Sequence, residues 1–128
     1  MLKNLFKKRK KKRVICGAEA IFTHIQSTID INISTYIVIL YADQKHTLGL
    51  SSDFELPRGK KDKETGRWAN EKFYINEKEF ATFEQFKSEA HIGNELFANI
   101  QSGIEIIEVD GEVPYILHDF EDYIVIDE

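Results

Sequence analysis

The sequence predicts an α+β domain in which a mostly antiparallel sheet carries one or two short helices packed on one face. Three observations support this prediction: β-branched residues dominate residues 14–52, a capped helix signal begins at Thr82, and hairpin signals occur towards both ends of the chain. With 128 residues, 42% of them hydrophobic, one domain can bury a core without disulfides or a structural metal.

The first 13 residues differ sharply in charge from the rest. Residues 1–13 contain eight lysines and arginines and no acid, whereas residues 14–128 contain nine basic and 22 acidic residues. We therefore divide the chain into a basic N-terminal segment, residues 1–13, and a single acidic α+β domain, residues 14–128. Leu2, Leu5 and Phe6 have helical spacing, so the basic segment can form one or two helical turns if its apolar side is covered.

Strands are predicted through most of residues 14–52. Apolar and polar residues alternate over residues 21–33, a pattern typical of half-exposed strands. Residues 36–42 are apolar on both faces and predict a central strand. A turn over residues 42–46 then leads into a short strand, residues 47–51. Residues 56–67 contain a proline, two glycines and five cations, and predict a solvent-facing loop.

A short strand over residues 71–75 and a helix are predicted next. Thr82 and Gln85 have the spacing of a capping box, so the helix begins there. Gly93 is expected to end this helix, and Asn94 to cap one or two further turns.

The last part of the chain predicts a hairpin and a final strand. Residues 104–111 predict a strand that ends in Asp-Gly, the pair favoured in type I′ turns. The return strand is expected to start near Glu112, with Pro114 displacing it to an edge or a bulge. Residues 123–126 are apolar on both faces and predict a buried last strand.

Motifs for catalysis or metal binding are absent from the sequence. His24, His46, His91 and His118 are scattered and Cys16 is the single cysteine, so the spacing of a zinc site is missing. No calcium loop, nucleophile elbow, dinucleotide fingerprint or kinase signature occurs. We therefore expect no enzyme activity, no metal, no cofactor and no small-molecule substrate. The single cysteine and the lack of a secretory apolar region predict a cytoplasmic location.

The acidic residues predict a surface for a basic partner. A field of this sign attracts cationic surfaces and repels nucleic acid. Acids on a rigid hairpin also lose less entropy on binding than acids on a flexible tail. The predicted partner-binding residues lie around the Asp-Gly hairpin and before the last strand: Glu105, Glu108, Asp110, Glu112, Asp119, Glu121 and Asp122.

The basic segment offers an alternative function. Its cations favour a peripheral module that docks on an anionic membrane or on nucleic acid, with a contact that weakens as salt rises. The residues predicted to carry this contact are Lys7, Lys8, Arg9, Lys10, Lys11, Lys12 and Arg13.

A family resemblance covers about half of the chain. It lies in three stretches: RWANEKFYINEKEFATFEQF (residues 67–86), HIGNELFANI (residues 91–100) and IEIIEVDGEVP (residues 104–114). Their tryptophan, aromatic-rich strand, capped helix and isoleucine-rich strand ending in Asp-Gly resemble the small cytoplasmic immunity proteins of bacterial polymorphic-toxin systems. The resemblance implies a single-domain inhibitor whose partner is a cognate protein toxin, often a nuclease, and which occupies the toxin's active-site face. The class of toxin stays open, because a toxin that attacks membranes or peptidoglycan needs no acidic mimic of nucleic acid.

Overall fold

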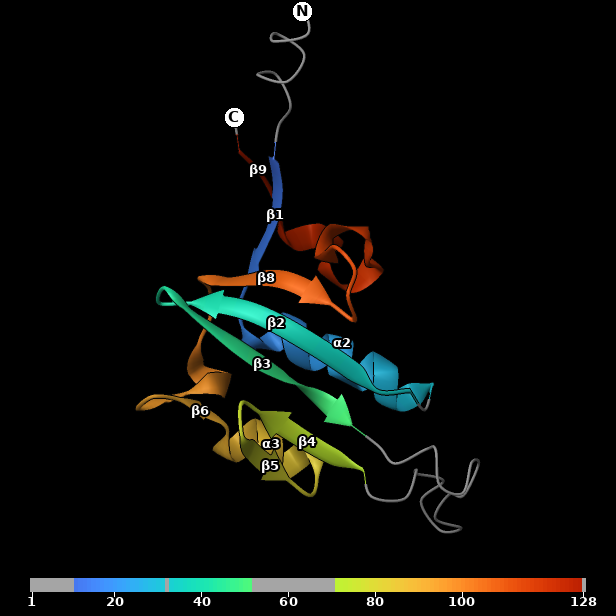
Figure 1. Ribbon diagram of the computed structural model, residues 1–128, viewed down its shortest axis with the longest axis vertical. Coiled ribbons are helices and arrows are strands. Elements are labelled where there is room, and N and C mark those ends of the chain that lie inside the picture. The colour runs from blue at the N-terminus through green and yellow to red at the C-terminus, as the bar shows by residue number, and fades with distance from the viewer. Residues whose placement is uncertain (1–10, 32, 52–70, 128) are drawn as a thin grey trace, which may run out of the picture.

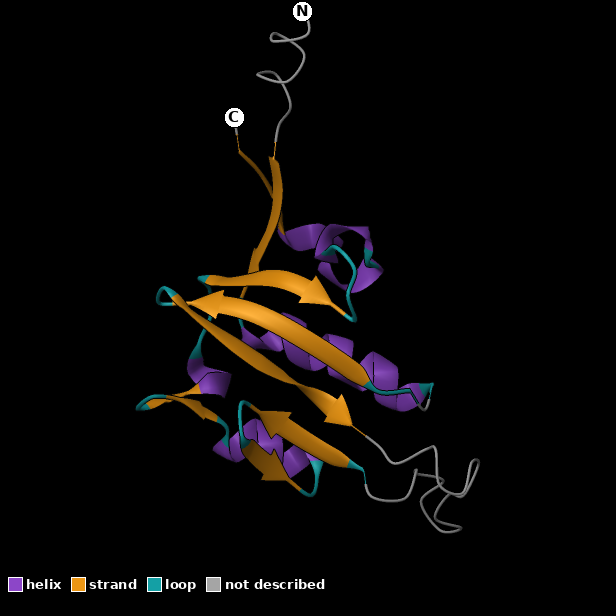
Figure 2. Cartoon of the chain, in the orientation of Figure 1, coloured by secondary structure: helices purple, strands orange, loops and turns teal. Residues whose placement is uncertain are grey.

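One antiparallel sheet forms the body of the protein, and both α-helices lie on the same side of it (Figures 1 and 2). The computed structural model describes residues 11–31, 33–51 and 71–127. The elements in chain order are β1 (Lys11–Cys16), α2 (Ala18–Asp30), β2 (Thr35–Tyr41), β3 (Gln44–Ser51), β4 (Lys72–Ile75), β5 (Lys78–Phe80), α3 (Phe83–Glu89), β6 (His91–Ile92), β7 (Glu95–Leu96), the 3₁₀ helix η1 (Phe97–Asn99), β8 (Ile104–Val109), the 3₁₀ helices η2 (Pro114–Ile116) and η3 (His118–Tyr123), and β9 (Ile124–Asp127).

The sheet has seven strands in the order β5-β4-β3-β2-β8-β1-β9, and each neighbouring pair is antiparallel. The predicted α+β class is therefore confirmed. Strand β1 begins at Lys11, so the last three residues of the predicted basic segment belong to the sheet and pair with β9. Residues 1–10, including the predicted helical turns, and the predicted loop over residues 56–67 lie outside the described residues.

Residues 18–30 form helix α2, so the prediction of strands over residues 21–33 is wrong. The buried positions of α2 follow helical rather than alternating spacing: Ala18, Ala20, Ile21, His24, Ile25 and Thr28. The helix begins at a tertiary contact, where the Ala18 N–H donates to the Ile100 carbonyl at 2.8 Å. A side chain at Gly17 would lie 2.4 Å from the Gln101 carbonyl oxygen, so this close approach needs glycine. Packing thus overrides the preference of the isoleucines for strands.

Strand β2 lies in the middle of the sheet, as predicted. Its buried residues Ile37 and Ile39 belong to the hydrophobic core. Ala42 and Asp43 have φ of 50° and 64°, which gives the two-residue turn that matches the twist of an antiparallel hairpin. Because this turn is so short, β3 begins at Gln44, three residues before the predicted strand.

The predicted short strand and capped helix are confirmed by β4 and α3. The Gln85 N–H donates to Thr82 Oγ1 at 3.1 Å, and the Gln85 side chain accepts from the Ala81 N–H at 3.3 Å. Strand β5 was not predicted. Helix α3 ends at Glu89 rather than at Gly93, which has φ of 59° and lies in the tight turn between β6 and β7.

The Asp-Gly turn after β8 is also confirmed, because Asp110 and Gly111 have φ of 53° and 83°. The predicted return strand is wrong: one bridge joins Val109 to Glu112, and η2 then starts at Pro114. Proline cannot donate to a strand ladder, but its fixed φ suits the first position of a helix.

The prediction of a buried last strand is wrong as well. Strand β9 is the edge of the sheet beside β1 and projects with it from the body (Figure 1). Val125 and Ile126 on β9 are exposed.

Phenylalanines fill the space between the sheet and the helices. Phe86 of α3 is fully buried, and its ring meets Phe80 edge-on at 5.8 Å and Phe22 of α2 at 5.9 Å between centroids. Phe73 of β4 stacks on Phe83 at 5.3 Å. This aromatic core fixes both helices on one face and leaves the segment after β8 to pack against the other end of the sheet.

Candidate functional site

The predicted partner-binding residues lie mainly on the segment between β8 and β9. This segment consists of the Asp-Gly turn followed by η2 and η3, and it packs beside β1 and β8 (Figure 1). Pro114 and Phe120 are its buried anchors. Its backbone is therefore held on the sheet, and the exposed side chains of this segment include Glu112, Val113, Ile116, Glu121 and Asp122.

Asp110 is engaged inside the protein. Its carboxylate accepts a hydrogen bond from the Tyr36 backbone N–H at 2.7 Å and another from the Thr35 hydroxyl at 3.1 Å. The Asp110 N–H donates in turn to the Tyr36 carbonyl at 2.8 Å. These contacts join the hairpin to the start of β2, so Asp110 has a structural role.

Asp119 is engaged as well. Its carboxylate lies 3.0 Å from Nδ1 of the buried His24, while His24 Nε2 lies 3.2 Å from the Thr35 hydroxyl. The order of carboxylate, imidazole and hydroxyl is the one used in nucleophilic catalysis. However, Thr35 is only 2% exposed and directs its hydroxyl to Asp110. The arrangement therefore joins α2, β2, the hairpin and η3, and gives a substrate no access to the hydroxyl.

Glu105 and Glu108 lie on β8 itself. Glu105 accepts two hydrogen bonds from the Arg13 guanidinium, at 2.8 and 3.2 Å. Glu108 is half-buried, opposite Val38 on the neighbouring strand. Neither carboxylate projects from the turn as the sequence predicted.

The other three predicted acids are exposed. Glu112 follows the turn, and Glu121 and Asp122 lie on η3. Glu121 is 3.2 Å from Nδ1 of His118, and this pair is exposed to solvent, so it contributes little to stability. The seven predicted residues thus separate into four that are engaged or half-buried and three that face solvent.

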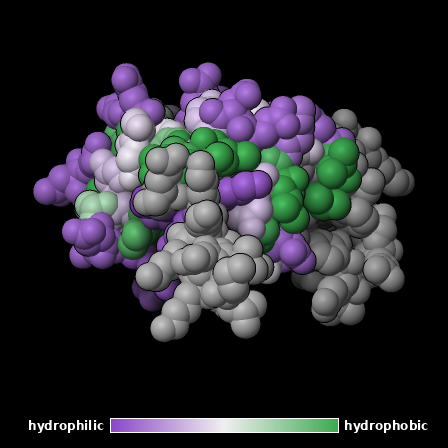
Figure 3. Space-filling view, turned by 90° about the horizontal axis from the view of Figure 1, so that it is seen from above, coloured by the Kyte–Doolittle hydropathy of each residue, from purple (hydrophilic) through white to green (hydrophobic). Residues whose placement is uncertain are grey.

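Exposed apolar side chains accompany these acids. Val113, Ile116 and Tyr123 are 43%, 61% and 39% exposed. Hydrophobic surface lies among hydrophilic surface at this end of the molecule (Figure 3). Sequence reasoning missed Val113 and Ile116. The signal was Pro114, which ends the strand and so removes its apolar neighbours from the sheet.

The described part of the predicted basic segment has two exposed cations. Lys11 and Lys12 are exposed, whereas Arg13 is held by Glu105. The Lys12 ammonium lies 5.5 Å from the centre of the Tyr115 ring, within the range of a cation–π contact. Lys7, Lys8, Arg9 and Lys10 lie outside the described residues.

No metal or nucleophile site is formed by the described residues. Among them, no group of three or more histidine, cysteine, aspartate or glutamate side chains could hold a metal ion. Cys16 is buried, and burial raises the pKa of its thiol to about 12, so the thiol is protonated at neutral pH. No helix within residues 11–31, 33–51 and 71–127 is long and apolar enough to cross a membrane.

Comparison with protein-family models, with curated proteins and with solved structures found no match.

Proposed function

We propose that this protein is an immunity-type inhibitor that binds and neutralises a cognate protein toxin. The supporting observation is the C-terminal surface, which we define as the exposed acids and apolar side chains of the segment between β8 and β9: Glu112, Val113, Ile116, Glu121, Asp122 and Tyr123. A protein interface needs apolar anchors that exclude water, and charges around them that steer the partner.

The charge of the domain favours a cationic partner. Residues 14–128 carry 22 acids against nine basic residues, so the field of the domain attracts basic surfaces. A nuclease presents cations that hold phosphates, and an acidic inhibitor can occupy the same cations. We further propose that the protein acts in the cytoplasm, where the free thiol of Cys16 stays reduced.

Growth protection tests the proposal. If the neighbouring gene encodes a large secreted protein with a variable C-terminal domain, that domain is expressed in bacteria with and without this chain. We expect the domain to stop growth and the chain to restore it. A domain that stays toxic, and that does not bind the purified chain, would contradict the proposal.

Charge reversal locates the surface. The variant with Glu112→Lys and Asp122→Lys should slow association with the toxin domain by about tenfold, because charges around an interface act mainly on the association rate. The matched control reverses two exposed acids elsewhere, Glu77→Lys and Glu89→Lys. Equal slowing by both pairs would show an effect of net charge rather than of this surface.

The apolar anchor needs a separate variant. Ile116→Ala removes the most exposed apolar side chain of the segment without opening the core. It should weaken toxin binding by about tenfold, mainly through faster dissociation. Stability provides the control, because the midpoint of thermal unfolding should stay within about 2 °C of that of the wild type.

Exposed Lys11 and Lys12 favour the second candidate, docking on an anionic membrane or nucleic acid. Deletion of residues 2–13 cannot test it, because that deletion removes half of β1. Changing Lys7, Lys8, Arg9 and Lys10 to glutamine leaves β1 intact. If docking is the function, this variant should lose binding to phosphatidylglycerol vesicles or duplex DNA at low salt, whereas growth protection would be unaffected under the first proposal.

A further inference from the structure

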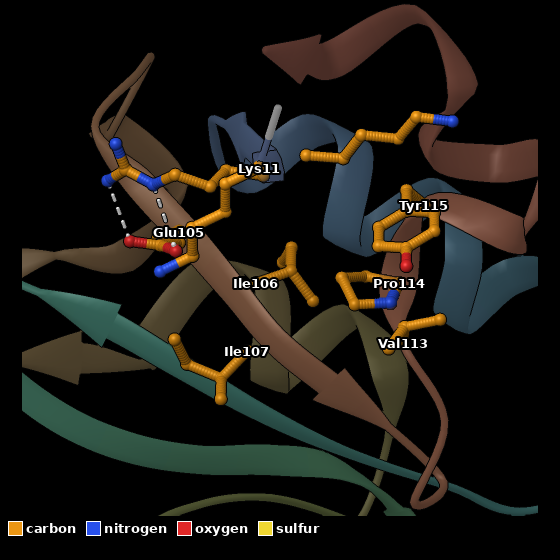
Figure 4. Close-up of a pocket in the computed structure, with 9 residues that line it drawn as sticks. Lys11, Glu105, Ile106, Ile107, Val113, Pro114 and Tyr115 are labelled. Carbon is orange, nitrogen blue, oxygen red and sulfur yellow. Dashed lines mark hydrogen bonds and ion pairs between the residues drawn. The ribbon is translucent and has the colours of Figure 1, made fainter. Parts of the chain in front are cut away.

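A small hollow lies where β1 and β8 diverge. Strand β1 pairs with β8 only from Val14 onward, and η2 packs beside the two strands where they separate. The hollow has a volume of about 200 Å³. Figure 4 shows its two sides: Lys11 and Glu105 lie on one side, and Val113, Pro114 and Tyr115 on the other.

The charge of this hollow is opposite to that of the domain. Three cations line it, Lys11, Lys12 and Arg13, against the single acid Glu105. Arg13 and Glu105 are bound to each other at 2.8 Å. Lys11 and Lys12 are consecutive on β1, so their side chains diverge: Lys11 lies on the Glu105 side of the hollow, and the Lys12 ammonium lies 5.5 Å from the centre of the Tyr115 ring on the other side. Within residues 11–31, 33–51 and 71–127 neither lysine forms an ion pair, so an anion beside Tyr115 can be bound by Lys12.

The size of the hollow limits its occupant. Sites for small molecules usually have volumes of about 300–1,000 Å³, so 200 Å³ is small for a metabolite and suits one side chain. Ile107, Val113 and Tyr115 provide apolar and aromatic surface for a hydrocarbon stem. A carboxylate at the end of a stem packed on Tyr115 would lie near the Lys12 ammonium.

We infer that the hollow binds a glutamate side chain of a protein partner, flanked in the partner by apolar residues. This inference rests on the proposed protein-binding function and adds a second chemical requirement to it. The partner presents cations to the C-terminal surface and one glutamate to the hollow. Val113 belongs to both sites, so the two contacts are adjacent and can be made by one partner.

Short peptides can separate the contribution of the glutamate carboxylate to binding from that of the apolar residues that flank it. The probes are acetyl-Leu-Glu-Leu-amide, its neutral isostere acetyl-Leu-Gln-Leu-amide, and acetyl-Gly-Glu-Gly-amide, which lacks the apolar neighbours. The protein is labelled at isoleucine and valine methyl groups and titrated with each peptide by NMR. We expect saturable shifts at Ile107 and Val113 with the first peptide, and binding weaker by about fivefold or more with each of the others.

Lysine variants test the charge. Lys11→Gln with Lys12→Gln should abolish the difference between the glutamate and glutamine peptides. Lys78→Gln, at an exposed lysine on the opposite edge of the sheet, should leave that difference unchanged. All three changed positions are exposed, so we expect the variants to fold, and an unchanged methyl spectrum of the core is the check on this.

Two results would overturn the inference. Equal binding of the glutamate and glutamine peptides would show that the lysines select no anion. Equal shifts with inorganic phosphate or with phosphatidylglycerol vesicles would show a general anion site rather than a glutamate pocket. If growth protection fails while the peptides still bind, the proposed inhibition of a toxin is refuted but the glutamate pocket is not. The two proposals can therefore be judged separately.

Discussion

Replacing Asp110 with glycine should destabilise the protein by about 2 kcal/mol. The change removes the two hydrogen bonds that the carboxylate accepts from the Tyr36 N–H and the Thr35 hydroxyl, at 2.7 and 3.1 Å. Each bond contributes about 1 kcal/mol, the ordinary net value for an intramolecular hydrogen bond, because Asp110 is exposed and water screens its charge. The added freedom of the glycine chain in the unfolded state contributes about 0.5–1 kcal/mol more. Glycine adopts the φ of 53° without the strain that aspartate carries there, and this relief offsets the entropic contribution, so the net loss is about 2 kcal/mol.

Asp110→Asn is the matched control for this loss. Asparagine keeps the acceptor for the Tyr36 N–H, and its amide can donate to the Thr35 hydroxyl oxygen, which is then free to donate to His24 Nε2. Asparagine also accepts positive φ well. The asparagine variant should therefore stay within about 0.5 kcal/mol of the wild type.

Thermal and urea unfolding followed by circular dichroism measure both variants. For a domain of this size about 1 kcal/mol corresponds to about 3–5 °C, so Asp110→Gly should lower the midpoint by about 6–10 °C. Faster hydrogen exchange of the Tyr36 amide would locate the effect at the lost bond. A glycine variant as stable as the wild type, or an asparagine variant as unstable as the glycine variant, would refute the assignment of Asp110 to the hairpin.

Three further predictions concern the core and two groups with raised pKa values. Cys16, whose pKa burial raises to about 12, should react with a disulfide reagent at pH 8 only as fast as the protein unfolds; rapid labelling of the native protein would contradict its burial. Phe86→Ala should lower the free energy of unfolding by about 3–5 kcal/mol in urea titrations, because a fully buried ring leaves a cavity among its neighbours. The pKa of Tyr74 is raised from 10.0 to about 12 by burial and, to a smaller extent, by Tyr36 and Asp110, so the phenol ionises more readily in the unfolded chain. The stability that the protonated phenol contributes is complete below pH 10 and is lost as the pH rises from 10 to 12. Over that range the midpoint of urea unfolding should therefore fall less steeply with pH in Tyr74→Phe than in the wild type.

Local signals in the sequence predicted local structure well. The capping box at Thr82 and Gln85 and the Asp-Gly turn at Asp110 each depend on residues within three positions of one another, and both are present in the structure. Helix α2 was misread because its isoleucines at positions 21, 25 and 29 satisfy alternation as well as helical spacing. Its start carries no capping side chain and depends on the Ile100 carbonyl, which is distant in sequence. The exposed positions of the helix, Thr23, Gln26 and Asp30, had the three- and four-residue spacing that could have identified it.

The candidate site was predicted only in part for the same reason. Acidic composition indicated a region in which Glu112, Glu121 and Asp122 are exposed. It could not distinguish these acids from Asp110 and Asp119, because their hydrogen-bond partners lie 74 to 95 positions away in the chain. The hollow beside Tyr115 could not be foreseen either, since it exists only where two strands from opposite ends of the chain separate.

The position of β1 in the sheet sets an order for synthesis on the ribosome. Strand β1 is made before any other described strand, yet its neighbours in the sheet are β8 and β9, which are made last. At about 5–20 residues per second, the pairing between Cys16 and Ile104 must wait on the order of 5–20 seconds after Cys16 is translated. During that time β2, β3 and β4 can form their hairpins, while the apolar residues Val14 and Cys16 stay without their strand partners. Strand β1 is therefore accessible to chaperones and proteases for most of synthesis, and the sheet closes in a late step that joins β1 to β8 and β9.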